Sequence, residues 1–126
     1  MITVAVGILR DDEGRVLVTR RAASAHQGGL WEFPGGKLEA GETREEALIR
    51  ELKEELRIDV DPFEFVITID HSYPDFRLIM HSFKCRILSD KEPELTEHLQ
   101  SKWLIPSDLD VLDWAAADVP IVEVLK

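Results

Sequence analysis

Runs of apolar and β-branched residues recur along the chain and predict a series of β-strands. The first run, ITVAVGIL at 2–9, is apolar at nearly every position, as expected of a well-buried strand. A turn at 11–14 leads into a shorter run at 16–19, which we expect to pair with the first strand in antiparallel fashion. Three more strands are predicted over 62–69, 76–88 and about 102–105, with turn chemistry at 71–75.

The segment 44–57 has the periodicity of an amphipathic helix. Thr43 and Glu46 match a capping box, in which each side chain hydrogen-bonds an otherwise unpaired backbone N–H. Shorter helices are predicted to begin at 106–108 and to cover 121–125. At about 100° per residue, four apolar side chains of the long helix fall on one stripe that should face the core. They are Leu48, Ile49, Leu52 and Leu56.

Acidic residues follow a neighbouring stripe of the same helix. Glu51, Glu54 and Glu55 are spaced i, i+3 and i+4, and Arg50 borders them within reach of Glu54. Like charges at these spacings cost about 0.2–0.5 kcal/mol per pair in an isolated helix. The stripe is therefore either a solvated acidic face or a set of ligands for a cation.

Length and charge limit the classes of function. The chain has 126 residues and 14.4 kDa, which fits one domain over 1–126, and neither a repeat nor a linker interrupts it. With 15 Lys and Arg against 25 Asp and Glu, its formal charge is −10. This balance argues against binding of long nucleic acids, which needs a basic surface. It would also repel a small phosphorylated substrate unless metal cations neutralise the charge.

Other features favour a cytoplasmic protein. No apolar run reaches the roughly 20 residues of a membrane span. The first residues, MITVAVGILR, lack the basic leader and small-residue cleavage site of a signal peptide. The single Cys85 forms no internal disulfide, which suits a reducing compartment. The oligomeric state stays open between a monomer and a homodimer.

A glycine pair precedes the acidic helix. At Gly35 and Gly36 the backbone approaches other groups closely, so that a carbonyl there is able to face a bound ion. Mg²⁺ prefers carboxylates, water and substrate phosphate as ligands. The glutamates also include a candidate general base to activate water. No His/Cys spacing indicates zinc, and no Ser–His–Asp arrangement indicates a nucleophile.

At this point the chain resembles a known family. Gly36, Glu42 and the run RELKEELRI at 50–58 are similar to the Nudix box, Gly-x5-Glu-x7-Arg-Glu-apolar-x-Glu-Glu-x-Gly-apolar. Every charged position of that pattern is matched. The likeness extends over essentially the whole chain towards MutT-like nucleotide pyrophosphohydrolases. Its further segments are 4–8, 19–21, 31–37, Glu97 six residues before Trp103, and 117–120.

The resemblance implies a fold and a reaction. The fold is α+β, the Nudix α/β/α sandwich with a mixed β-sheet between helices. The reaction is Mg²⁺- or Mn²⁺-dependent hydrolysis of a nucleoside diphosphate linked to another group. In MutT-like members a nucleoside triphosphate gives monophosphate and pyrophosphate, and 8-oxo-dGTP is the first expected substrate, in nucleotide pool sanitation. The alternatives are hydrolysis of CTP, dCTP or 5-methyl-dCTP, and a non-catalytic Nudix-like lesion-recognition domain.

The resemblance also implies site residues. The metal ligands would be the Gly35 carbonyl, Glu51, Glu54, Glu55 and Glu97. Arg50 would orient the glutamates through charge-assisted hydrogen bonds. The general base stays open among Glu51, Glu54 and Glu97. Arg21 matches a position near the substrate and would stabilise phosphate charge; its alternative is a surface arginine at the end of a strand.

Outside the box, a few residues are candidates to bind the base. Phe33 and Tyr73 would flank it by stacking or belong to the core. His26 would approach phosphate or lie on the surface, whereas His71, His81 and His98 receive no role.

Asp118 stands where the matching MutT residue is an asparagine that both donates and accepts. An ionised aspartate only accepts. It suits the N7–H of 8-oxoguanine, although it would repel O6 unless protonated, and it suits the exocyclic amine of cytosine. Alternatively, Asp118 caps the last helix ahead of Pro120.

One position departs from the box. The family glycine after the helix is Arg57 here. Glycine suits a left-handed helix end, where another residue costs of order 1 kcal/mol. We expect this departure to affect stability rather than catalysis, because Arg57 lies beyond the glutamates.

Overall fold

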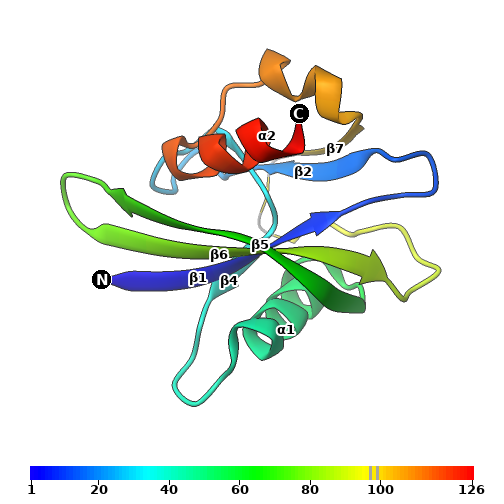
Figure 1. Cartoon of the computed structure of the whole chain (residues 1–126), viewed down its shortest axis with the longest axis horizontal. Coiled ribbons are helices and arrows are strands. Elements are labelled where there is room, and N and C mark those ends of the chain that lie inside the picture. Colours follow the sequence, from blue (N-terminus) through cyan, green and yellow to red (C-terminus); the bar gives the residue numbers. More distant parts are fainter. Residues whose placement is uncertain (97, 99) are drawn as a thin grey trace.

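The computed structural model describes residues 1–96, 98 and 100–126 (Figure 1). Its strands are β1 (Ile2–Leu9), β2 (Val16–Arg20), β3 (Trp31–Glu32), β4 (Gly35–Lys37), β5 (Val60–Ser72), β6 (Arg77–Ile87) and β7 (Gln100–Leu104). The α-helices are α1 (Arg44–Leu56) and α2 (Val119–Leu125), and two 3₁₀ helices cover Pro106–Val111 and Ala116–Asp118. The predicted elements are therefore confirmed, with boundaries shifted by a few residues.

Strand β1 is central to a four-stranded mixed sheet in the order β4-β1-β6-β5. It runs antiparallel to β4 and parallel to β6, and β5 pairs antiparallel with β6 along the far edge. The register places Ala5 opposite Gly36 on one side and His81 on the other. This sheet confirms the predicted α+β class, and it sets the glycine pair beside the buried first strand.

The predicted partner of 16–19 was wrong. Strand β2 belongs to a second, three-stranded antiparallel sheet in the order β3-β2-β7. Only an isolated bridge between Arg10 and Val16 joins it to the end of the first strand. One edge of β1 is paired with β6 along residues 2–9 and the other with β4 along residues 4–6, so a hairpin partner finds no free edge in the middle of the strand.

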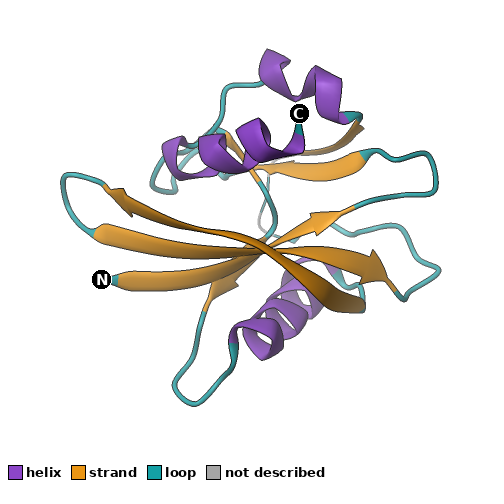
Figure 2. Ribbon diagram, in the orientation of Figure 1, coloured by secondary structure: helices purple, strands orange, loops and turns teal. Residues whose placement is uncertain are grey.

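Helix α1 covers one face of the mixed sheet (Figure 2). Leu48, Leu52 and Leu56 are fully buried, as predicted, and pack with Ala5, Leu9 and Phe83 of the sheet. Ile49 was expected on the same stripe, but it is 41% exposed. Ala47 is buried instead on the other flank of the leucine row, so the buried stripe is rotated away from Ile49.

The second layer of helices lies on the opposite side of the molecule from α1, next to β2 and β7 (Figure 1). Its core joins residues from both sheets to α2, among them Val6, Val18 and Ile121. The arrangement is the α/β/α sandwich that the resemblance implied. In the part of the chain that the structure describes, no helix combines the length and apolar character that crossing a membrane requires.

Both ends of α1 are capped, as the sequence predicts for its N-terminus. At the N-terminus Thr43 accepts a hydrogen bond from the Glu46 N–H at 3.1 Å, and the Thr43 N–H donates to the Glu46 carboxylate at 2.8 Å. At the C-terminus Arg57 adopts the left-handed conformation, with φ 59°, and its N–H donates to the Lys53 carbonyl. The chain thus keeps the glycine geometry with an arginine in its place.

Replacing this arginine by glycine should stabilise the fold. Arg57→Gly relieves the strain of a side chain at positive φ, partly offset by greater freedom of the unfolded chain, for a net gain of about 0.5–1 kcal/mol. We expect the melting temperature to rise by about 2–4 °C. Arg57→Ala is the matched control, because it removes the same charge and keeps the Cβ. A larger effect of Arg57→Gly on activity than on melting would contradict this assignment.

Candidate active site

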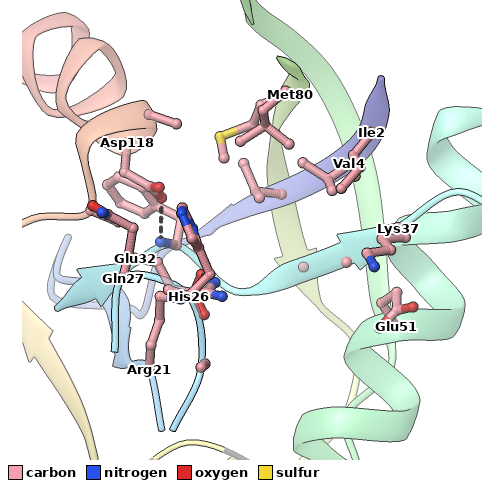
Figure 3. Close-up of a pocket in the computed structure, with 18 of the residues that line it drawn as sticks. Ile2, Val4, Arg21, His26, Gln27, Glu32, Lys37, Glu51, Met80 and Asp118 are labelled. Carbon is pink, nitrogen blue, oxygen red and sulfur yellow. Dashed lines mark hydrogen bonds and ion pairs between the residues drawn. The ribbon is translucent and has the colours of Figure 1, made fainter. Parts of the chain in front are cut away.

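A cavity of about 670 Å³ brings together most of the predicted site residues (Figure 3). Figure 3 shows Asp118 at one end and Glu51 with Lys37 at the other. The predicted residues that line it are Arg21, His26, Phe33, Gly35, Glu51, Glu54, Glu55, Tyr73 and Asp118. Arg50 lies beside the wall, bound to its glutamates. Glu97 falls outside the residues that the structure describes.

Close packing of β4 against α1 and β1 explains the glycine pair. A Cβ added at Gly36 would collide with the carboxylate of Glu51. One added at Gly35 would collide with the backbone of Ala5 and Val6. A side chain at Gly35 would therefore clash with fixed backbone, and one at Gly36 would displace the carboxylate of Glu51 from its place on the cavity wall.

Arg50 holds the acidic end of the cavity together. Its Nε and Nη2 donate to the two oxygens of Glu42 at 2.7 and 2.9 Å. Its Nη1 donates to Glu51 at 2.8 Å and to Glu54 at 3.3 Å, and Nη2 also binds the Lys37 carbonyl at 2.9 Å. Hydrogen bonds from Arg50 lower the pKa of Glu42, and the carboxylates raise the pKa of Arg50. One guanidinium thus offsets the repulsion among carboxylates that the sequence spacing creates.

The donor chemistry of this wall fits a hard cation. Among the described residues, no three His, Cys, Asp or Glu side chains already converge on a single point. Mg²⁺ does not need such a cage, because it is usually held by one or two carboxylates and completes its shell with water and substrate phosphate. Glu51 and Glu54 supply carboxylates on the cavity wall, with side chains 15% and 60% exposed, and Gly35 lines the same wall.

The opposite end of the cavity contains a buried acid. Asp118 is 2% exposed, and one of its oxygens accepts a hydrogen bond from the Phe33 N–H at 2.9 Å. Burial raises the pKa of this carboxyl well above its usual range, and the nearby Glu32 carboxylate adds to the effect. Burial thus shifts the equilibrium of this carboxyl towards its neutral form, compared with an aspartate in water. The alternative role as a helix cap was wrong, because Asp118 makes no side-chain hydrogen bond to the start of α2.

Aromatic rings surround the same end. The Tyr73 hydroxyl accepts a hydrogen bond from the Ala117 N–H at 3.1 Å, next to Asp118. The His26 ring lies 4.7 Å from that of Tyr73 and 5.0 Å from that of Phe76. His26 is exposed among these rings and lines the same cavity as the glutamates of α1.

Phe33 is almost completely buried at this end of the cavity. Its side chain is packed so that only 1% of the residue is exposed, and its ring stacks on Trp114 with the centroids 5.0 Å apart. Its backbone N–H is what binds Asp118.

Three cavity residues escaped sequence reasoning. Glu32 accepts hydrogen bonds from Arg21 at 2.6 Å and pairs with His98 at 2.9 Å. Gln27 takes a left-handed backbone conformation, with φ 58°, and its amide oxygen accepts from the Ala116 N–H. No local signal marks these contacts, since His98 is 66 residues from Glu32 and Gln27 is 89 residues from Ala116.

Cys85 takes no part in this site. It lies in β6, is 4% exposed and belongs to the core under α1. Burial raises the pKa of its thiol to about 12, so the reactive thiolate is disfavoured at neutral pH.

Comparison with known proteins gives the same family as the box. The model of the NUDIX domain matches residues 5–124. An 8-oxo-dGTP diphosphatase of Escherichia coli (strain K12) is 37% identical over 125 residues, which are 99% of this chain and 96% of that protein. A CTP pyrophosphohydrolase of the same organism is 34% identical over 125 residues, covering 98% and 90% of the two chains.

Solved structures agree with the sequence relatives. The crystal structure of a MutT NUDIX hydrolase from Burkholderia pseudomallei superimposes with a TM-score of 0.88 at 25% identity, over 99% of this chain and 98% of that one. The likeness therefore includes the sandwich as a whole as well as the acidic helix. On these grounds the chain belongs to the NUDIX domain family and is a hydrolase of phosphoric anhydrides.

Proposed function

We propose that this protein hydrolyses nucleoside triphosphates to monophosphate and pyrophosphate with the help of Mg²⁺ or Mn²⁺. The observation that carries the proposal is a single cavity with carboxylates at one end and a buried acid with aromatic rings at the other. A nucleotide has the matching polarity, with a planar base at one end and phosphates at the other. Relatives named 8-oxo-dGTP diphosphatase and CTP pyrophosphohydrolase support it.

The acidic end would hold the metal. With a net charge of −10, the protein needs a cation to bring phosphates close to Glu51 and Glu54. Gly35 through its carbonyl, Glu51, Glu54 and Glu55 would provide ligands, together with Glu97 as the sequence predicts. When bound, the ion supplies charge stabilisation for the phosphate oxygens and a lower pKa for coordinated water.

Side chains of the protein would supply the other catalytic functions. Arg50 positions Glu51 and Glu54 through hydrogen bonds and does not line the cavity itself. One carboxylate among Glu51, Glu54 and Glu97 would accept the proton of the attacking water. Arg21 lines the cavity, where it pairs with Glu32, and would place its positive charge towards the phosphates.

Asp118 would read the base. In its protonated form the carboxyl has one donor and remaining acceptor capacity, like the asparagine of MutT. It would donate to O6 and accept from N7–H of 8-oxoguanine, so 8-oxo-dGTP is the first expected substrate. The protein would then act in the cytoplasm, as a monomer or homodimer, to remove oxidised nucleotides before a polymerase uses them.

Cytidine triphosphates are the second candidate. The same protonated carboxyl would donate to N3 of cytosine and accept from its exocyclic amine. The likeness to a CTP pyrophosphohydrolase over nearly the whole chain favours this alternative specifically.

Pyrophosphate release from a nucleotide panel tests the proposal. The panel contains 8-oxo-dGTP, dGTP, dCTP and 5-methyl-dCTP, each assayed with and without Mg²⁺. We expect release that depends on Mg²⁺, with one substrate clearly preferred in kcat/KM. A strong preference for a cytidine nucleotide would replace the first substrate by the second. No release from any triphosphate would contradict the proposed reaction and favour a binding domain.

Removal of one carboxylate should abolish turnover without unfolding the protein. Glu54→Gln keeps the shape of a side chain that is 60% exposed, but it removes a proposed ligand or base, so kcat should fall by about 10²- to 10⁴-fold. The measurement is pyrophosphate release beside a thermal melt. Glu45→Gln is the matched control, because Glu45 lies in the first turn of the same helix outside the cavity. Near-normal turnover of Glu54→Gln would refute the role of Glu54.

The raised pKa of Asp118 predicts a pH effect on substrate binding. Because burial favours the protonated carboxyl, the donor to O6 is present at low pH and is lost as pH rises through the raised pKa. KM for 8-oxo-dGTP should therefore increase with pH in the wild type. Asp118→Asn keeps a donor and an acceptor at every pH and should flatten this dependence. Parallel KM profiles for both proteins would show that Asp118 is not the titrating group.

A further inference from the structure

Gln27 lines the cavity at the end where Asp118 lies (Figure 3). Its amide oxygen accepts a hydrogen bond from the Ala116 N–H at 3.4 Å. Ala116 begins the 3₁₀ helix that ends at Asp118. The next N–H of this short helix, that of Ala117, donates to the Tyr73 hydroxyl at 3.1 Å. The side chains of Gln27 and Tyr73 are therefore both bound to the short helix that contains the buried acid.

The loop holds Gln27 in a conformation that suits glycine better. Its φ of 58° lies in the left-handed region, which is unfavourable for a residue with a side chain. Two arginine side chains fix the loop around it. Arg20 Nε donates to the Gly29 carbonyl at 2.8 Å, and Arg21 Nε donates to the His26 carbonyl at 2.7 Å. The amide therefore reaches the cavity from a fixed backbone position.

The hydrogen bond to Ala116 determines which end of the amide is left for a ligand. A backbone N–H requires an acceptor, so the amide oxygen faces Ala116 and the NH₂ group points away from it. Gln27 is half-buried, and its Nε2 is open to solvent and makes no hydrogen bond to the described part of the chain. Gln27 thus offers N–H donors to the cavity, and these require an acceptor on the ligand.

Both candidate bases have such an acceptor beside the groups that Asp118 would bind. Along one edge, 8-oxoguanine presents O6, N7–H and O8 in a row, and cytosine presents its exocyclic amine, N3 and O2. With the Asp118 carboxyl on the first two groups, the third group in each row is a carbonyl oxygen, which only accepts. Guanine has C8–H in place of the O8 carbonyl and therefore offers no acceptor there.

We propose that the Gln27 amide donates a hydrogen bond to this carbonyl oxygen, O8 of 8-oxoguanine or O2 of cytosine. This assignment rests on the proposed function, since it requires a nucleotide whose base lies at Asp118. It makes Gln27 a residue that determines base specificity, because it favours bases that carry the oxygen beside the two groups bound by Asp118.

The test compares substrates that differ at this oxygen. In the presence of Mg²⁺, kcat/KM is measured for 8-oxo-dGTP against dGTP, and for CTP against 2-thio-CTP, in which sulfur, a weak acceptor, replaces O2. Gln27→Glu keeps an oxygen for the Ala116 N–H but removes the donors. For the base that the wild type prefers, the ratio within its pair should fall by at least about 3- to 10-fold, the value of one hydrogen bond.

Two further variants separate the lost donors from other effects. Gln27→Met keeps the length of the side chain without any charge, and its ratio should fall as well. Gln100→Glu adds the same charge at an exposed position of β7 outside the cavity, and it should keep the wild-type ratio. Because each ratio is measured on one protein, a loss of folded protein cancels in it.

Each result has a defined meaning. If both Gln27 variants turn over more slowly but keep the wild-type ratio, the proposal is overturned and Gln27 only ties the loop to Ala116. A changed ratio in Gln27→Glu alone would also overturn it, because the introduced charge would then be the cause. Absence of pyrophosphate release by the wild type from every triphosphate would instead contradict the proposed reaction, which separates the two failures.

Discussion

The grouping of carboxylates around Arg50 is the constraint on which the acidic end of the molecule depends. Glu42, Glu51 and Glu54 lie within 3.3 Å of one guanidinium, and Glu39 lies at 3.6 Å. Without this cation their mutual repulsion would oppose both the helix and the loop that leads into it. The same guanidinium binds the Lys37 carbonyl, so it also fastens the end of β4 to α1.

Other parts of the fold hold these carboxylates at the cavity wall. The leucine row of α1 buries the helix on the sheet, and the capping box fixes its first turn. Gly36 lets the strand approach until its backbone lies against the Glu51 carboxylate. The glutamates therefore face the cavity because apolar packing and glycine geometry place them there, at an electrostatic cost that Arg50 offsets.

Sequence reasoning succeeded where the determining interactions are local. The helix, its capping box and the order of Arg50 and the glutamates all lie within a few turns of one another, so periodicity and spacing identify them. Most predicted site residues outside the box also line the same cavity. They were found through the resemblance to a family whose members have the same fold.

The failures involve contacts between distant segments. The pairing of β2 depended on which strands occupy the edges of β1, and no short pattern contains that information. The exposure of Ile49 depended on how far the helix rotates on the sheet. The pairing of His98 with Glu32 and the raised pKa of Asp118 follow from burial in the assembled cavity, which single-residue chemistry does not predict.

The central claim is that the glutamates of α1 bind the divalent cation on which phosphate chemistry depends. Mn²⁺ binding, followed by electron paramagnetic resonance of the free ion, tests it without reference to turnover. The wild type and Glu45→Gln should bind Mn²⁺ alike, and Glu51→Gln should bind it at least about 10-fold more weakly. Equal affinity of all three proteins would contradict the account, because it would place the cation elsewhere.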